Sequence, residues 1–71
     1  MGGSLLKKLV IIGASGHGKV IADIALKNQY DEIVFLDDDK TITECAGFVV
    51  KGTTENIEEY LSWDFIVAIG D

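Results

Sequence analysis

Residues 9–20, LVIIGASGHGKV, leave few folds open to this chain. The segment begins with a short, almost wholly apolar run at Leu9–Ala14. A run without alternating polar residues is typical of a strand covered on both faces, as in a parallel sheet. Glycines at positions 13, 16 and 18 predict a tight loop after this strand. A helix of roughly residues 17–28 should follow, because these residues recur at helical spacing: Val20, Ile21, Ile24, Ala25 and Asn28.

The rest of the chain continues this alternation of strands and helices. The predicted elements are a strand at Ile33–Leu36, a loop at Lys40–Gly47, a short edge strand at Phe48–Lys51, a helix capped by Thr53 or Thr54, and a buried strand at Phe65–Ile69. Ile57, Tyr60 and Leu61 form the expected buried face of the second helix. The pattern predicts an α/β fold: a Rossmann-like open, mostly parallel sheet of three to four strands with flanking helices, truncated.

The expected strand order places the polar residues on one rim. In the sheet we expect the edge piece, then the second strand, the first strand and the last strand. The order reverses beside the first strand, and ligands of such sheets bind at the carboxyl ends of the strands at that point. Three segments should therefore meet there: the loop at 13–18, the run Asp37–Asp39, and Gly70-Asp71.

The glycine-rich loop has the chemistry of an anion site. Gly13, Gly16 and Gly18 let backbone N–H groups approach an anion, and the following helix directs its positive end to the same place. Ser15 adds a hydroxyl donor and His17 a ring N–H. Such a loop suits a diphosphate. The alternative is that the glycines only form a tight strand-to-helix turn.

Asp37 and Asp38 lie about 20 residues beyond Gly18, where a dinucleotide fold places its ribose-binding acid. A carboxylate there can accept hydrogen bonds from sugar hydroxyls or from the N–H groups of a base. The alternative is a solvated acidic turn, which is the interpretation we adopt for Asp39. No metal site is predicted from this run, and no catalytic residue is assigned, because His17 has no partner nucleophile or orienting acid nearby in sequence.

The fingerprint G-x-G-x-x-G is only partly matched, since Ser15 stands at its middle glycine. An NAD(P)-binding domain of an oxidoreductase remains an alternative, although a side chain at that position crowds a pyrophosphate. A nucleotide-hydrolysing P-loop is disfavoured because Val20 follows Lys19, where that motif requires Ser or Thr. A non-catalytic interaction domain is the third interpretation.

Composition limits the partners. Twelve acidic residues against six lysines give a net charge of −6, which argues against nucleic acid and against anionic membrane surfaces. Cys45 is the single cysteine, so no internal disulfide can form and a reducing, cytoplasmic location fits best. Residues 1–7 are expected to be a flexible leader.

Three motifs in order carry a family resemblance: GASGHGKV, then FLDD, then FIVAIGD. Together they resemble the N-terminal domain of the bacterial sugar acetyltransferases of the pilin-glycosylation and sialic-acid type. The resemblance implies that residues 8–71 hold a nucleotide-activated sugar, expected to be a UDP-sugar. It further implies that Ser15, Gly16 and His17 contact the substrate, that Asp37 and Asp38 contact its nucleoside part, and that Gly70 closes the site.

Members of this family continue with more of this domain and with a left-handed β-helix. That second part carries the catalytic histidine, binds acetyl-CoA and builds a homotrimer. The resemblance therefore implies an incomplete substrate-holding domain at 8–71, with acetyl-CoA as co-substrate of the parent enzyme but not bound by this part. The implied reaction is N- or O-acetylation of a sugar in the cytoplasm.

Overall fold

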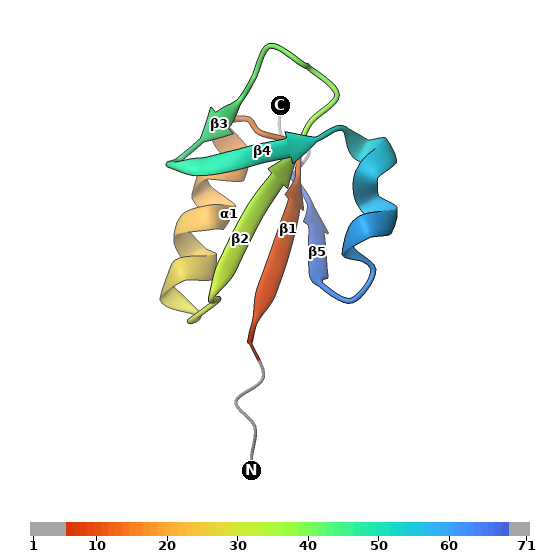
Figure 1. Ribbon diagram of the computed structural model, residues 1–71. Helices are drawn as coiled ribbons and strands as arrows, with labels where there is room; N and C mark the ends of the chain where they lie inside the picture. The colour runs from red at the N-terminus through yellow and green to blue at the C-terminus, as the bar shows by residue number, and fades with distance from the viewer. Residues whose placement is uncertain (1–5, 69–71) are drawn as a thin grey trace.

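The computed structural model describes residues 6–68 and contains one five-stranded sheet (Figure 1). The central strands are β1 (Lys8–Ile12) and β2 (Glu32–Leu36), which run parallel with Lys8 beside Glu32 and Ile12 beside Leu36. β5 (Asp64–Val67) pairs in parallel with the other side of β1. The sheet order β3-β4-β2-β1-β5 contains the predicted order of four strands and confirms the α/β class.

Two apolar layers explain why β1 and β2 lack polar alternation. α1 (Gly16–Lys27) covers one face of the sheet, and the 3₁₀ helix η1 (Thr54–Tyr60) covers the other. The layer under α1 contains these buried residues: Leu9, Ile11, Ala22, Ala25, Ile33 and Phe35. The layer under η1 contains Val10, Val34 and Leu36, with Ile57, Tyr60 and Trp63 packed against them. Both faces of β1 and β2 are therefore removed from water, as the continuous apolar runs predict.

The buried face of α1 differs from the prediction. The helix buries Gly18, Ala22 and Ala25, whereas Val20 and Ile24 are 55% and 53% exposed. Small side chains allow the helix backbone to approach the sheet closely, so the two larger residues stand at its flank. Neither α1 nor any other helix within residues 6–68 has the length and apolar character needed to cross a membrane.

The segment predicted as a loop at residues 40–47 contains a fifth strand. β3 (Glu44–Cys45) pairs antiparallel with β4 (Phe48–Gly52) through a turn in which Ala46 and Gly47 have positive φ. β4 is consequently not the edge: it lies between β3 and β2 and is parallel to β2. The sheet thus has one strand more than the three to four expected.

Two predictions of burial near the end of the chain are wrong. Leu61, expected under the second helix, is 78% exposed, because η1 ends at Tyr60 and Leu61 lies beyond its last turn. All four residues of β5 are exposed, although a buried strand is predicted there. β5 is the last strand of the sheet, and neither α1 nor η1 extends over it among the residues described.

Candidate functional site

Two glycines of the β1–α1 loop are required by the fold itself. Gly13 has φ of 113°, and a Cβ built there lies 2.6 Å from the carbonyl oxygen of Ala68. A Cβ on Gly18 would collide with the carbonyl oxygen of Gly13 and lie 2.9 Å from the ring of Phe35. These positions therefore let the loop pass close to β5 and let α1 approach β2.

The fold itself does not require a glycine at position 16. A Cβ on Gly16 meets no atom within 4 Å, and its φ lies outside the left-handed region. It is the first residue of α1 and is exposed. The empty space beside its Cα is therefore open to a molecule approaching the loop from outside.

Ser15 is the N-cap of α1 and its hydroxyl oxygen accepts a long hydrogen bond from the N–H of Gly18 at 3.4 Å. Within residues 6–68, the backbone N–H groups of Ser15, Gly16 and His17 have no acceptor. The positive end of the α1 dipole adds to their combined field. The loop can thus offer three neighbouring amides, the Ser15 hydroxyl and the exposed His17 ring to an anion.

Asp37 directly follows β2 and reaches back to the loop. Its Oδ2 accepts a hydrogen bond from the N–H of Ala14 at 2.7 Å, and its Oδ1 accepts one from the N–H of Asp39 at 2.8 Å. The structure therefore brings the loop and the acidic run together, as the sheet order predicts.

Asp38 holds the start of η1. Its Oδ1 accepts from the N–H of Thr54 at 3.0 Å and from the Thr54 hydroxyl at 2.8 Å. The backbone bond from Thr54, followed by the hydroxyl bond, lowers the pKa of the Asp38 carboxyl. Oδ2 of Asp38 accepts no hydrogen bond within the described residues and remains open to a ligand.

Asp39 is bound to its own turn. Its Oδ1 accepts from the hydroxyl of Thr41 at 2.6 Å and from the N–H of Thr41 at 3.0 Å. These bonds, the hydroxyl one first, lower the pKa of the Asp39 carboxyl. The three neighbouring aspartates thus have three different local partners.

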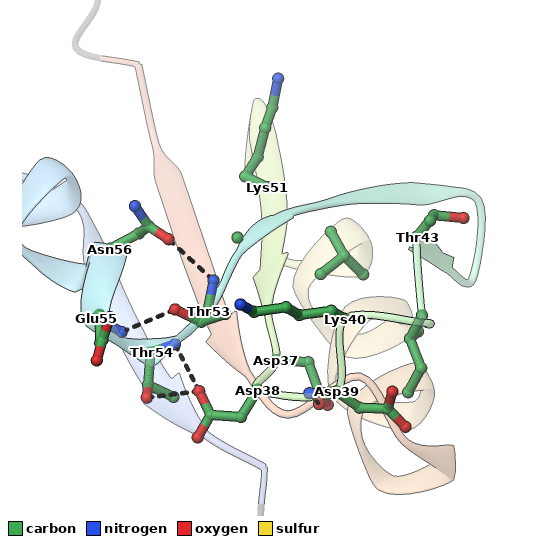
Figure 2. Close-up of a pocket in the computed structure, with 13 residues that line it drawn as sticks. Asp37, Asp38, Asp39, Lys40, Thr43, Lys51, Thr53, Thr54, Glu55 and Asn56 are labelled. Atoms are coloured by element: carbon green, nitrogen blue, oxygen red, sulfur yellow. Dashed lines mark hydrogen bonds between the residues drawn. The ribbon is translucent and has the colours of Figure 1, made fainter.

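An open pocket of about 640 Å³ lies where β2 and β4 end, and Figure 2 shows its residues. It is lined by Asp37, Asp38, Asp39, Lys40, Ile42, Thr43, Val50, Lys51, Gly52, Thr53, Thr54, Glu55 and Asn56. In Figure 2 the Lys40 side chain extends toward Thr53, whereas Lys51 points away from the aspartates. Asp37 belongs both to this pocket and to the anchoring of the loop, so the pocket and the free amides are neighbours.

The sequence interpretation did not include the residues that β4 and η1 contribute to this pocket. Thr53 caps η1: its N–H donates to Oδ1 of Asn56 at 2.9 Å, and its hydroxyl accepts from Glu55 at 3.3 Å. The sequence indicates that Thr53 or Thr54 caps a helix. It does not indicate that β4 ends on the rim and so places these threonines at the pocket. Gly70, proposed to close the site, lies outside the described residues.

Cys45 lies behind the loop. It is buried on β3, and its thiol donates to the carbonyl oxygen of Ser15 at 3.7 Å. Burial raises the pKa of the thiol, with a smaller opposing effect of Lys19 and a further raising effect of Asp37. The thiol is thus a protonated, supporting group and not a nucleophile.

The family model described as the PglD N-terminal domain matches residues 8–71, which is nearly the whole chain. The chain belongs to the PglD N-terminal domain family. The resemblance of the three motifs to the pilin-glycosylation acetyltransferases is confirmed by this match.

Two solved structures are similar to this member of the PglD N-terminal domain family. The acetyltransferase domain of PglB from Neisseria gonorrhoeae FA1090 is 49% identical, with a TM-score of 0.77 over 89% of this chain. A second structure of that domain, in complex with acetyl coenzyme A, is 45% identical, with a TM-score of 0.79 over 90% of this chain. The match covers 32% of the gonococcal chain in each structure, so this chain spans about a third of its length.

Proposed function

We propose that the rim formed by the β1–α1 loop and the ends of β2 and β4 binds a nucleotide-activated sugar. The observation that carries this proposal is the pairing of two different surfaces. The amides of Ser15, Gly16 and His17, which have no acceptor within residues 6–68, suit a diphosphate, and the adjoining pocket offers the Asp38 carboxylate and Thr54 hydroxyl to a nucleoside. A nucleoside diphosphate sugar needs both surfaces, side by side.

The charges of the site agree with such a ligand. The pocket contains Asp37–Asp39 and Glu55, and among these carboxylates Asp38 has an oxygen that can accept a hydrogen bond from a ribose hydroxyl or a base N–H group. Lys40 and Lys51 line the same pocket and partly offset these acids. The diphosphate belongs at the loop, where the helix dipole and N–H groups provide positive potential, and the nucleoside belongs in the pocket.

We further propose that the chain is the substrate-holding part of an acetyl-CoA-dependent sugar N- or O-acetyltransferase, with a UDP-sugar as ligand. The acetyl coenzyme A bound to the gonococcal PglB domain supports this assignment. We place acetyl transfer and acetyl-CoA binding in other parts of a cytoplasmic, homotrimeric parent enzyme. The role left to this chain is to bind and orient the sugar nucleotide.

An NAD(P)-binding domain is the alternative that the loop geometry keeps open. Gly13 lies in the tight turn, as the first glycine of the dinucleotide fingerprint does. Gly18 lies at the contact between helix and strand, as the last glycine of that fingerprint does. Against it, Ser15 stands where that fingerprint requires close approach of the backbone to the pyrophosphate.

Calorimetric titration with UDP, UDP-N-acetylglucosamine, GDP-mannose and NAD distinguishes these functions. We expect UDP and the UDP-sugar to bind more tightly than the other two ligands. Tight binding of NAD without a response to any nucleotide-sugar would contradict the proposal in favour of the oxidoreductase alternative. Absence of binding for all four would leave a non-catalytic interaction domain.

A further inference from the structure

Asp37 bridges two parts of the rim through its carboxylate. Both oxygens accept backbone hydrogen bonds, one from Ala14 in the β1–α1 loop and one from Asp39 beyond β2. The side chain is half-buried between these segments. Each carboxylate oxygen of Asp37 thus already accepts one hydrogen bond from the protein itself in the structure without ligand.

The Ala14 bond belongs to a set that fixes the loop backbone. The preceding N–H, of Gly13, donates to the carbonyl oxygen of Leu36 at 2.8 Å, and the carbonyl of Ser15 accepts from the Cys45 thiol. Ala14 itself is buried, so its N–H cannot readily exchange the Asp37 carboxylate for water. These bonds end where the free amides begin, at Ser15.

Electrostatics argue against direct contact between Asp37 and a diphosphate. A carboxylate next to an anion is repulsive, and this effect is strongest where solvent is partly excluded. Asp37, whose two oxygens already accept backbone hydrogen bonds, can instead act on the protein. Here it orients the backbone that presents the amides.

We infer that Asp37 is a positioning residue of the proposed nucleotide-sugar site: it fixes the β1–α1 loop through the Ala14 N–H and so sets the direction of the diphosphate-binding amides. This inference rests on the proposed function and differs from the nucleoside contact that the family resemblance implies for Asp37. Asp38, with its free oxygen in the pocket, keeps the nucleoside role.

The first test uses the unmodified chain without ligand. A long-range NMR experiment that detects scalar coupling across hydrogen bonds should connect the Ala14 nitrogen with the side-chain carboxyl carbon of Asp37. Hydrogen exchange should be slow at Ala14 and fast at Ser15 and Gly16. Fast exchange at Ala14 without the coupling would overturn the inference, whichever ligand the site binds.

The second test separates the two halves of the ligand. In Asp37→Ala, affinity for UDP-N-acetylglucosamine should fall about tenfold, as expected for a site that loses a charged hydrogen bond, while uridine binding stays within about twofold. The matched control Asp38→Ala should weaken both ligands and leave the Ala14 resonance in place. Equal weakening of both ligands by Asp37→Ala would instead make Asp37 a nucleoside contact and overturn the inference.

Two further outcomes are decisive. If Asp37→Ala does not fold, the same titration is made with Asp37→Asn. This variant should bind the UDP-sugar more weakly if its Ala14 N–H has lost the hydrogen bond to residue 37, and as tightly as the unmodified chain if that bond is kept. Weaker binding with the Ala14 hydrogen bond kept, or unchanged binding with that bond lost, overturns the inference. If neither uridine nor the UDP-sugar binds the unmodified chain, the proposed function fails, while the Ala14–Asp37 coupling still decides whether the loop is positioned as inferred.

Discussion

Gly13, Gly16 and Gly18 look alike in the sequence but differ in what the structure requires of them. A side chain at Gly13 or Gly18 would meet backbone atoms, whereas the space beside Gly16 is empty. The tight-turn interpretation therefore accounts for two of the glycines and leaves the third unexplained. Gly16 is the residue at which structural and ligand-binding requirements can be separated.

Replacement of Gly16 by alanine should preserve the fold and impair the site. Alanine restricts the unfolded chain and suits a helix, so we expect the free energy of unfolding to rise by about 0.4–1 kcal/mol. The added methyl group occupies the open space, and affinity for UDP-N-acetylglucosamine should fall at least about tenfold, or about 1.4 kcal/mol. Urea unfolding and calorimetric titration of the same preparation measure both effects.

Gly13→Ala provides the opposite control. Its positive φ and the approach to Ala68 predict a loss of about 1–3 kcal/mol of stability, whether or not ligand is present. A Gly16→Ala variant that binds the UDP-sugar as tightly as the unmodified chain would contradict the placement of the diphosphate at the loop.

At the scale of elements, η1 depends on the side chains at its first turn. Asp38, Thr53 and Asn56 together satisfy backbone N–H groups that a helix start leaves unpaired. η1 in turn covers Val10, Val34 and Leu36, so the cap supports one of the two apolar layers. Asp38 therefore serves both the proposed site and the fold.

The lowered pKa of Asp38 predicts a pH dependence of stability. Because the pKa is below its usual value of 3.8 in the folded chain, the ionised carboxylate stabilises the fold above that pH, and this contribution is lost as the pH falls through the folded pKa. Asp38→Asn keeps an acceptor oxygen but not the charge. It should therefore be less stable than the unmodified chain at pH 7 and closer to it at about pH 3.

Urea unfolding at the two pH values tests this expectation. Asp23→Asn is a suitable control, since Asp23 forms an exposed ion pair with Lys27 at 3.4 Å, which contributes little to stability. The same loss of stability at both pH values for Asp38→Asn would show that its charge does not support η1.

The helix α1 shows where periodicity is insufficient. Apolar spacing correctly predicts the existence and extent of the helix within a residue at each end. It does not distinguish the face with Ala22 and Ala25 from the flank with Val20 and Ile24, because both repeat at helical intervals. Which face is buried depends on how closely the backbone must approach the sheet, and that distance is a tertiary property.

For the whole molecule, the sheet order and the meeting of the loop with Asp37 follow from general rules of parallel α/β topology. Two features, the β3–β4 pairing and the pocket, do not follow from these rules. The β3–β4 pairing depends on positive φ at Ala46, which the sequence does not indicate. The pocket depends on β4 ending beside β2, so Thr54 reaches Asp38 across 16 residues of chain. Both require long-range pairing that local patterns do not contain.

The exposure of β5 has a consequence for the behaviour of the 71-residue chain. Phe65, Ile66 and Val67 are 63%, 42% and 47% exposed, on a strand that pairs only with β1 among residues 6–68. A groove of about 350 Å³ between α1 and β5 is lined in part by Ile24, Phe65 and Ile66, and Ile24 is itself 53% exposed. Apolar edge strands of this kind promote association through backbone pairing and burial of side chains.

We therefore predict concentration-dependent self-association of the 71-residue chain, detectable by sedimentation velocity. A double variant, Phe65→Thr with Ile66→Thr, places β-branched side chains that suit a strand at both positions but removes most of the apolar surface there, and it should shift the chain toward monomer. Leu61→Ser is the matched control, because Leu61 is 78% exposed but does not belong to the groove. An equal shift with Leu61→Ser would assign the association to general surface hydrophobicity. A shift confined to the double variant would assign it to β5, and ligand affinity should then be unchanged, because the groove shares no residue with the pocket that contains Asp38.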